Sequence, residues 1–224
     1  MEDIGNTLYS IIGEIGKEKI QSDITLNIGL SKQYIQMILA QYNKRVDVAN
    51  DESIGTLCEA LLHFMLTACT LPSVRKVTID NINLDIVIPN LHTLSNFPAK
   101  AIVIQIPKDV KSITKHEQNN LRKIQPNVKN LWIVTKAPLF GDYINYSIES
   151  VNNRKTSSVV RNFGDIIVDI DTFLEQTKDR TFRFSTNYSY SYLSSSYSWS
   201  EYFEDYLQPD TIEKQSNLKI ADIP

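Results

Sequence analysis

The chain has 224 residues, of which 42% are hydrophobic and 22% charged, and its net charge is -3. A protein that only coats the phosphate backbone would be basic, so this balance argues against non-specific nucleic-acid binding, although a local basic face is still allowed. The longest apolar run, residues 60–71, is interrupted by His63 and is shorter than the roughly 20 residues of a membrane span. We therefore expect no membrane association.

The first residues and the cysteines favour a cytoplasmic protein. Residues 1–6 are acidic and lack the charged-then-apolar pattern of a secretion signal. Cys58 and Cys69 fall on one predicted helix about 16 Å apart, at a rise of about 1.5 Å per residue, and cannot pair with each other there. Buried, reduced thiols are the expected outcome.

Residues 1–51 are predicted to form a helical region. Apolar side chains recur at helical spacing over residues 4–15, and again on one face of residues 34–39. Ser31 is a good N-cap for the second of these helices. Residues 43–51 are polar and indicate a turn.

Residues 52–180 are predicted to form an α/β (α+β) core. A helix over residues 53–71 is ended by Pro72, and a polar helix follows at residues 111–124. Short apolar runs predict four strands, at residues 74–79, 84–88, 101–106 and 131–135. Residues 80–83 are typical of a hairpin turn and residues 89–100 of a loop. The resulting order is αβββαβ.

The C-terminal part carries weaker patterns. Residues 143–148 could form a strand, residues 165–170 are predicted as one, and residues 171–177 begin as a short helix. Residues 181–224 form a third region, in which Tyr and Ser alternate between residues 185 and 200. That composition lacks the aliphatic side chains of a core, so a mobile tail and a strand added to another surface are both open.

Two polar residues interrupt the apolar strands. Asp85 lies in the middle of the second predicted strand, and Gln105 lies in the third. Together with the αβββαβ order over residues 55–135, they resemble the PD-(D/E)XK nuclease superfamily, which includes restriction enzymes and Holliday-junction resolvases. The resemblance implies a restriction-endonuclease-like core with a mixed sheet, DNA as the partner, and Mg²⁺ as the cofactor if the protein is an active endodeoxyribonuclease.

The motif of that family departs from its usual form here. The family places an Asp on one strand and, on the next, an acid two residues before a Lys, because residues i and i+2 share a face. Asp85 matches, Gln105 stands in the place of the acid, and Pro107 stands where the Lys would be. Lys108 follows one place later and points to the opposite face, unless Pro107 ends the strand or a bulge resets the register. The resemblance implies Asp85 and Gln105 as metal ligands and Lys108 as the group that orients water.

Glu59 lies in the helix that often completes such sites in the family, so it is a fourth candidate catalytic residue. His63 is one turn further on, and a buried Glu59–His63 pair is an alternative. Asp85 could instead bond turn amides or a nearby Lys, and Lys108 could be a solvated surface residue. The displaced cation and the neutral amide make an inactive site an open alternative.

Residues 21–39 are similar to a helix-turn-helix. Apolar residues fall at the expected places, Thr25 is small where helices pack closely, and Gly29 occupies the turn, where a left-handed backbone is favoured. A generic helical hairpin is the alternative. In the helix-turn-helix interpretation, five side chains would contact phosphates or base edges. They are Lys32, Gln33, Gln36, Lys44 and Arg45.

Two functions follow from these patterns. The first is a DNA-associated protein with a nuclease-like fold, active or inactive. The second is a non-catalytic interaction or scaffold protein that uses the Tyr/Ser-rich tail to bind a protein partner. A homodimer is a further possibility implied by the resemblance.

Overall fold

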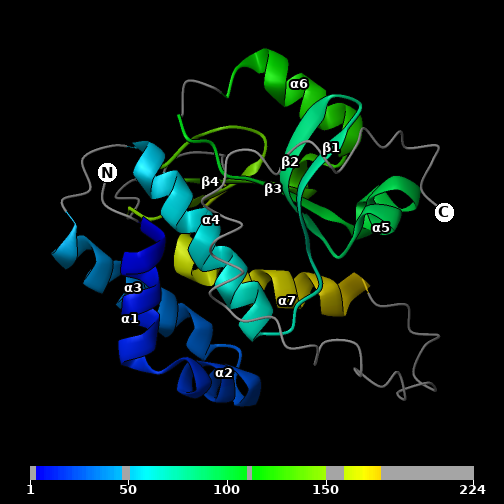
Figure 1. Cartoon of the computed structure of the whole chain (residues 1–224). Coiled ribbons are helices and arrows are strands. Elements are labelled where there is room, and N and C mark those ends of the chain that lie inside the picture. Colours follow the sequence, from blue (N-terminus) through cyan, green and yellow to red (C-terminus); the bar gives the residue numbers. More distant parts are fainter. Residues whose placement is uncertain (1–3, 47–50, 110–112, 150–158, 178–224) are drawn as a thin grey trace, which may run out of the picture.

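The computed structural model describes residues 4–46, 51–109, 113–149 and 159–177, which form helices and a six-stranded sheet (Figure 1). The strands are β1 (Val74–Ile79), β2 (Ile82–Ile88), β3 (Ile102–Gln105), β4 (Leu131–Thr135), β5 (Ile144–Ser147) and β6 (Val160–Asn162). They lie side by side in chain order. The β1–β2 and β2–β3 pairs are antiparallel and the pairs from β3 to β6 are parallel, so the sheet is mixed, as predicted.

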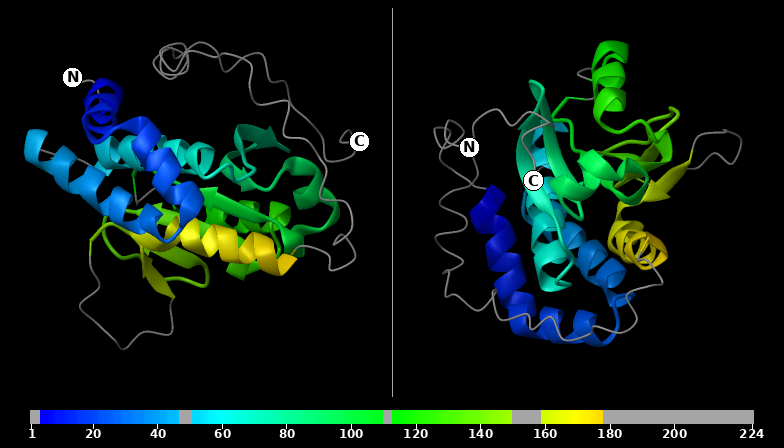
Figure 2. Two further views of the ribbon diagram at one scale, coloured as in Figure 1. Left: turned by 90° about the horizontal axis from the view of Figure 1, so that it is seen from below. Right: turned by 90° about the vertical axis from the view of Figure 1, so that its right-hand side faces the viewer.

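Helices cover both faces of this sheet (Figure 2). They are α1 (Ile4–Ile15), α2 (Lys17–Leu26), α3 (Leu30–Arg45), α4 (Asp51–Ala68), α5 (Leu91–Asn96), α6 (Lys115–Ile124) and α7 (Ile166–Thr177), with short 3-10 turns η1 (Pro98–Lys100), η3 (Val128–Asn130) and η4 (Phe163–Asp165). The first four helices and α7 share one core with Ile86 and Ile104 of the sheet. Helices α5 and α6 share the other with Val87 and Val103. Both faces are therefore buried, which explains the continuous apolar runs of the central strands.

Several predicted elements are confirmed. The strand predicted at residues 131–135 matches β4, the helix predicted at residues 53–71 corresponds to α4, and the strand considered at residues 143–148 corresponds to β5. In the hairpin turn, Asp80 and Asn81 have φ values of 49° and 62°, as a two-residue turn between antiparallel strands requires.

Two elements were predicted wrongly. Residues 165–170 were expected to be a strand, but α7 begins at Ile166. Ile166, Ile167 and Ile170 are fully buried, at the spacing of one helix face, and a short β-branched run does not separate this pattern from a strand. Residues 89–100 were expected to be a loop, but they contain α5 and η1. The side chain of Asn90 caps α5 by accepting a hydrogen bond of 2.8 Å from the N–H of Thr93.

The turn between α2 and α3 also differs from its prediction. Gly29 has φ of -60° and ψ of -22°, which is right-handed, whereas a left-handed backbone was expected. The Asn27 side chain accepts a hydrogen bond of 3.0 Å from the Gly29 N–H, so the turn closes without that conformation. Because α3 begins at Leu30, Ser31 lies buried inside its first turn and is not the N-cap.

The division of the chain at residues 51 and 180 stays a prediction. The Tyr/Ser-rich segment falls within residues 178–224, which lie outside the described residues.

Candidate functional site

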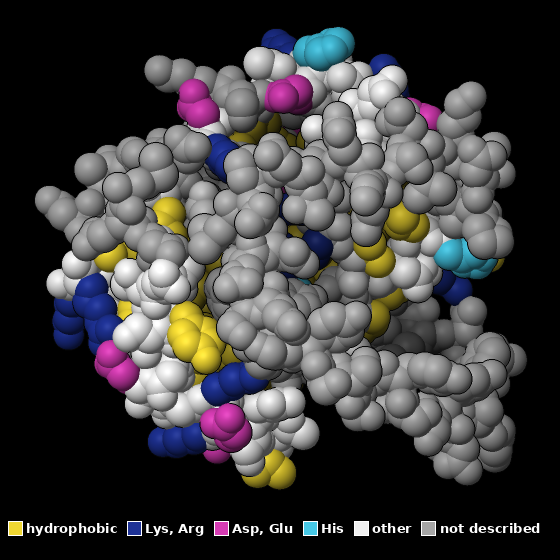
Figure 3. All heavy atoms as spheres, in the orientation of Figure 1, with side chains coloured by type: hydrophobic (Ala, Val, Ile, Leu, Met, Phe, Trp, Pro, Cys, Tyr) yellow, Lys and Arg dark blue, Asp and Glu magenta, His cyan; other side chains and the backbone are white. Residues whose placement is uncertain are grey.

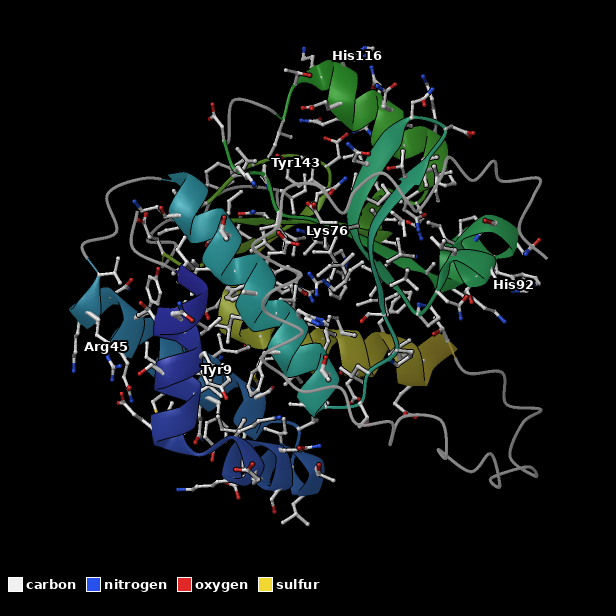
Figure 4. All side chains as sticks on the ribbon, in the orientation of Figure 1. Tyr9, Arg45, Lys76, His92, His116 and Tyr143 are labelled. Atoms are coloured by element: carbon white, nitrogen blue, oxygen red, sulfur yellow. The ribbon has the colours of Figure 1, made fainter. Side chains whose placement is uncertain are left out.

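A cavity of about 580 Å³ lies where β3 ends, bordered by α4, the β1–β2 hairpin and α6. All four predicted catalytic residues line it, although they come from three distant parts of the chain. They are Glu59, Asp85, Gln105 and Lys108. His116 and Asn120 of α6 line the opposite side, and Figure 4 shows His116 on that helix, beyond the sheet.

Backbone hydrogen bonds hold the two central side chains. Asp85 Oδ2 accepts a hydrogen bond of 2.7 Å from the N–H of Ile106. Gln105 Oε1 accepts one of 3.1 Å from the N–H of Asp85, while its Nε2 donates one of 2.7 Å to the carbonyl of Asn83. The Gln105 side chain thus bonds two backbone groups of β2, on either side of Leu84, and this explains why an amide, with one acceptor and one donor, stands at this position.

The end of β3 decides where Lys108 lies. Strand β3 ends at Gln105, before Pro107, which has no N–H with which to continue the ladder. Lys108 therefore does not follow the strand alternation, and it lines the same cavity as Asp85. Gly55 of α4 allows this segment to pack closely, because a Cβ there would lie 3.3 Å from the Pro107 carbonyl oxygen.

Two cations from β1 accompany Glu59. The Glu59 carboxylate lies 3.6 Å from Arg75 Nη2 and 3.3 Å from Lys76 Nζ. The Glu59 side chain is 9% exposed, Arg75 16% and Lys76 52%. A buried carboxylate needs such compensation, since an unpaired buried charge is strongly unfavourable.

Burial perturbs the titration of two groups around this site. Burial raises the pKa of Asp85 to about 6, the Ile106 N–H and the Lys76 and Lys108 charges oppose the rise, and the Glu59 charge adds to it. Burial, with a smaller effect of the Arg75 charge, lowers the pKa of His63 to about 3. Asp85 thus changes charge close to neutral pH, as is common at functional sites.

The oxygens at this site are of the kind that Mg²⁺ prefers. Asp85 and Glu59 each offer a carboxylate and Gln105 an amide oxygen, while Mg²⁺ keeps several waters and needs only one or two carboxylates from a protein. Within the described residues, no group of three or more His, Cys, Asp or Glu could hold a metal ion. Asp85, Glu59 and Gln105 are the side chains of this cavity that could hold a hydrated Mg²⁺.

The five predicted DNA contacts of α3 do not join this cavity. In Figure 1, helix α3 lies at the lower left and helix α6 at the top. Lys32 forms an ion pair of 2.6 Å with Asp165, and Arg45 donates a hydrogen bond of 2.9 Å to Glu14. Arg45 is exposed, and so are the other three, Gln33, Gln36 and Lys44.

Sequence reasoning missed Arg75 and Lys76. The signal was present, because a two-residue turn at Asp80–Asn81 places residues 76 and 85 opposite each other. The register agrees, since Arg75 pairs with Ile86 and Val77 with Leu84. Lys76 is labelled in Figure 4, and Lys and Arg side chains are visible near the centre of the same face in Figure 3.

No protein-family model and no curated protein matches the sequence. Among solved structures, the chain is similar to the restriction endonuclease PspGI in complex with substrate DNA, with 14% identity, a TM-score of 0.50, and coverage of 79% of this chain and 94% of PspGI. It is also similar to metal-depleted Ecl18kI in complex with uncleaved, modified DNA. The identity is 12%, the TM-score is 0.49, and the match covers 92% of this chain and 85% of Ecl18kI. The fold is therefore the restriction-endonuclease-like fold that the sequence predicted.

Proposed function

From this restriction-endonuclease-like fold, we propose that the chain is a DNA-associated protein and that the cavity around Asp85 is a Mg²⁺-dependent site acting on a DNA phosphodiester. The observation that supports it most is the convergence of Asp85, Gln105, Glu59 and Lys108 on one cavity. Fold alone would not argue function, because one fold supports many activities. The proposal therefore rests on the site, where these side chains surround Asp85, an acid whose pKa is raised by burial.

Each residue of the cavity is assigned one role in phosphodiester hydrolysis. Asp85 and Gln105 are proposed as the metal ligands, with Glu59 as an accessory acid. A bound Mg²⁺ would lower the pKa of water and offset the charge of the phosphate. The bond from the Ile106 N–H to Oδ2 orients the Asp85 carboxylate and leaves Oδ1 for a ligand. Lys108, at the edge of the cavity, would orient the attacking water.

Contacts outside the cavity belong to the proposal as well. PspGI was solved with its substrate DNA, which supports DNA as the partner of a chain with the same fold. Exposed Gln33, Gln36 and Lys44 on α3 are proposed as further DNA contacts. A homodimer, a cytoplasmic location, and a scaffold role for residues 181–224 stay predictions.

The test is cleavage of linear and branched duplex DNA with Mg²⁺ or Mn²⁺. Asp85→Asn removes the charge but keeps an oxygen for the Ile106 N–H, and Asp142→Asn, the same change at an exposed acid, is the matched control. We expect cleavage by the wild type and by Asp142→Asn, and a loss of about 100-fold or more in Asp85→Asn, the size seen when one charge-stabilising group is removed.

Other outcomes separate the parts of the proposal. Cleavage that survives in Asp85→Asn would reject the site. Salt-dependent binding without cleavage would support DNA association and reject hydrolysis. No binding to any DNA would reject the proposed function as a whole.

A further inference from the structure

No cation stands two residues after Gln105, because that position, just beyond the end of β3, is Pro107. A site that acts on a phosphodiester needs a positive group beside the phosphate, where negative charge develops. Lys108 lines the cavity, but it belongs to the segment after the strand. The described residues offer another cation on the neighbouring strand pair.

Lys76 lies at the level of Asp85 in the β1–β2 pair. The flanking partners are Arg75 with Ile86 and Val77 with Leu84, which places residues 76 and 85 at the same level. The Lys76 ammonium lies 3.3 Å from the Glu59 carboxylate, which lines the cavity. Its charge acts on Asp85, where it opposes the rise in pKa. Lys76 is therefore adjacent to both acids of the site.

The backbone at Lys76 is unusual. Its φ is 47°, a left-handed value that is uncommon for residues other than glycine and that carries a conformational cost. Val74 and Val77, three residues apart on β1, both pack into the core that the sheet shares with α5 and α6. Leu84 and Val87 of β2, also three apart, pack into the same core. In a regular strand, residues three apart would face opposite sides. The alternation therefore breaks on both strands at the level of Lys76 and Asp85.

The two cations of β1, Arg75 and Lys76, differ in how far their side chains are exposed to solvent. The Arg75 side chain is 16% exposed and accompanies the 9% exposed Glu59, whereas Lys76 is 52% exposed. The buried carboxylate of Glu59 and the half-buried guanidinium of Arg75 compensate each other's charge. The ammonium of Lys76 is the one that an incoming anion could reach.

We propose that Lys76 of β1 is the phosphate-binding cation of this site and takes the role that Pro107, just after β3, cannot fill. This inference rests on the proposed function. Its ligand is a phosphate of duplex DNA. The alternative is that Lys76 only neutralises Glu59, and the experiment is chosen to separate the two.

The test measures duplex binding by fluorescence anisotropy over a series of salt concentrations, with cleavage in Mg²⁺ as a second readout. Each phosphate contact adds about 0.9 to the slope of log affinity against log salt. We expect Lys76→Met and Lys76→Gly to lower this slope by about one contact and cleavage by about 100-fold. Lys76→Arg should keep the slope, and so should Lys19→Met, a control at an exposed lysine of α2.

Lys76→Gly removes the ammonium without adding backbone strain, because glycine accepts a positive φ. It therefore controls for a loss of binding that is caused by misfolding. A lost contact in this variant, with an undiminished melting temperature, is a loss of the ammonium and not of the fold. The double variant Glu59→Gln with Lys76→Met tests the alternative. If Lys76 only neutralises Glu59, the double variant should regain the wild-type salt slope. If Lys76 binds phosphate, the slope of the double variant should stay as low as that of Lys76→Met.

The outcomes also separate this inference from the proposed function. Wild-type binding with an unchanged slope in Lys76→Met and Lys76→Gly would overturn the role of Lys76 and leave the proposed function standing. Rescue by Glu59→Gln would do the same. A wild type that binds no DNA would overturn both.

Discussion

The side-chain oxygen of Gln105 accepts a hydrogen bond of 3.1 Å from the backbone N–H of Asp85, so the Gln105 side chain is tied to the backbone of the neighbouring strand. Asp85 in turn accepts from the N–H of Ile106, the residue after Gln105. These two hydrogen bonds join the middle of β2 to the end of β3.

Gln105→Glu should destabilise the protein. A glutamate cannot donate to the Asn83 carbonyl, which now accepts from Gln105 Nε2 at 2.7 Å, and it adds a negative charge beside Asp85. We expect the free energy of unfolding to fall by about 1–2 kcal/mol, the usual cost of losing such a bond. Urea denaturation at pH 7 measures it, with Gln21→Glu, at an exposed position of α2, as the control. Equal stability of both variants would contradict the bridging role.

Asp85 should make the protein less stable as pH rises. Its pKa is about 6 in the fold and near 4 in the unfolded chain. The folded state therefore binds the proton more strongly, and stability is lost as pH rises from about 4 through 6, by roughly 2–3 kcal/mol in total. Asp85→Asn should remove this loss, which unfolding curves between pH 4 and 8 would show. Parallel wild-type and variant profiles would contradict it.

His63 should act in the opposite direction. Its pKa is lowered to about 3 by burial, so the unfolded chain takes up a proton first as pH falls below about 6.5. We expect a loss of about 2 kcal/mol between pH 6.5 and 5 that is absent in His63→Gln. The comparison uses the change in unfolding free energy between the two pH values. His92→Gln, at an exposed histidine, should keep the wild-type loss.

Helix α3 can be tested through its exposed end. If it contacts DNA, as the helix-turn-helix resemblance predicts, Lys44→Glu should weaken duplex binding at low salt and lower the salt slope by about one phosphate contact. Lys44 is exposed, so the fold should tolerate the change. Lys19→Glu on α2 is the control. Identical binding by both variants would remove α3 from the DNA interface.

Local patterns were sufficient for much of the fold. The apolar run of residues 131–135 predicted β4 to the residue, and the resemblance that rested on the αβββαβ order implied the mixed sheet. Where a short β-branched run fits both a strand and a helix face, as at residues 165–170, local pattern failed, because the choice depends on which core the side chains meet. Ile166, Ile167 and Ile170 meet the core of the N-terminal helices and form one face of α7.

The candidate site, like the fold, was predicted in part from the sequence and decided in part by tertiary packing. Asp85 and Gln105 could be named from the sequence, since a polar residue inside an apolar strand is a local signal. Glu59 and Lys108 were named through the family resemblance. That they share one cavity was decided by tertiary structure: Pro107 ends β3, Gly55 lets α4 approach, and the β1–β2 register brings Lys76 beside Asp85. These are contacts between segments far apart in the chain, and only the packed structure sets their distances.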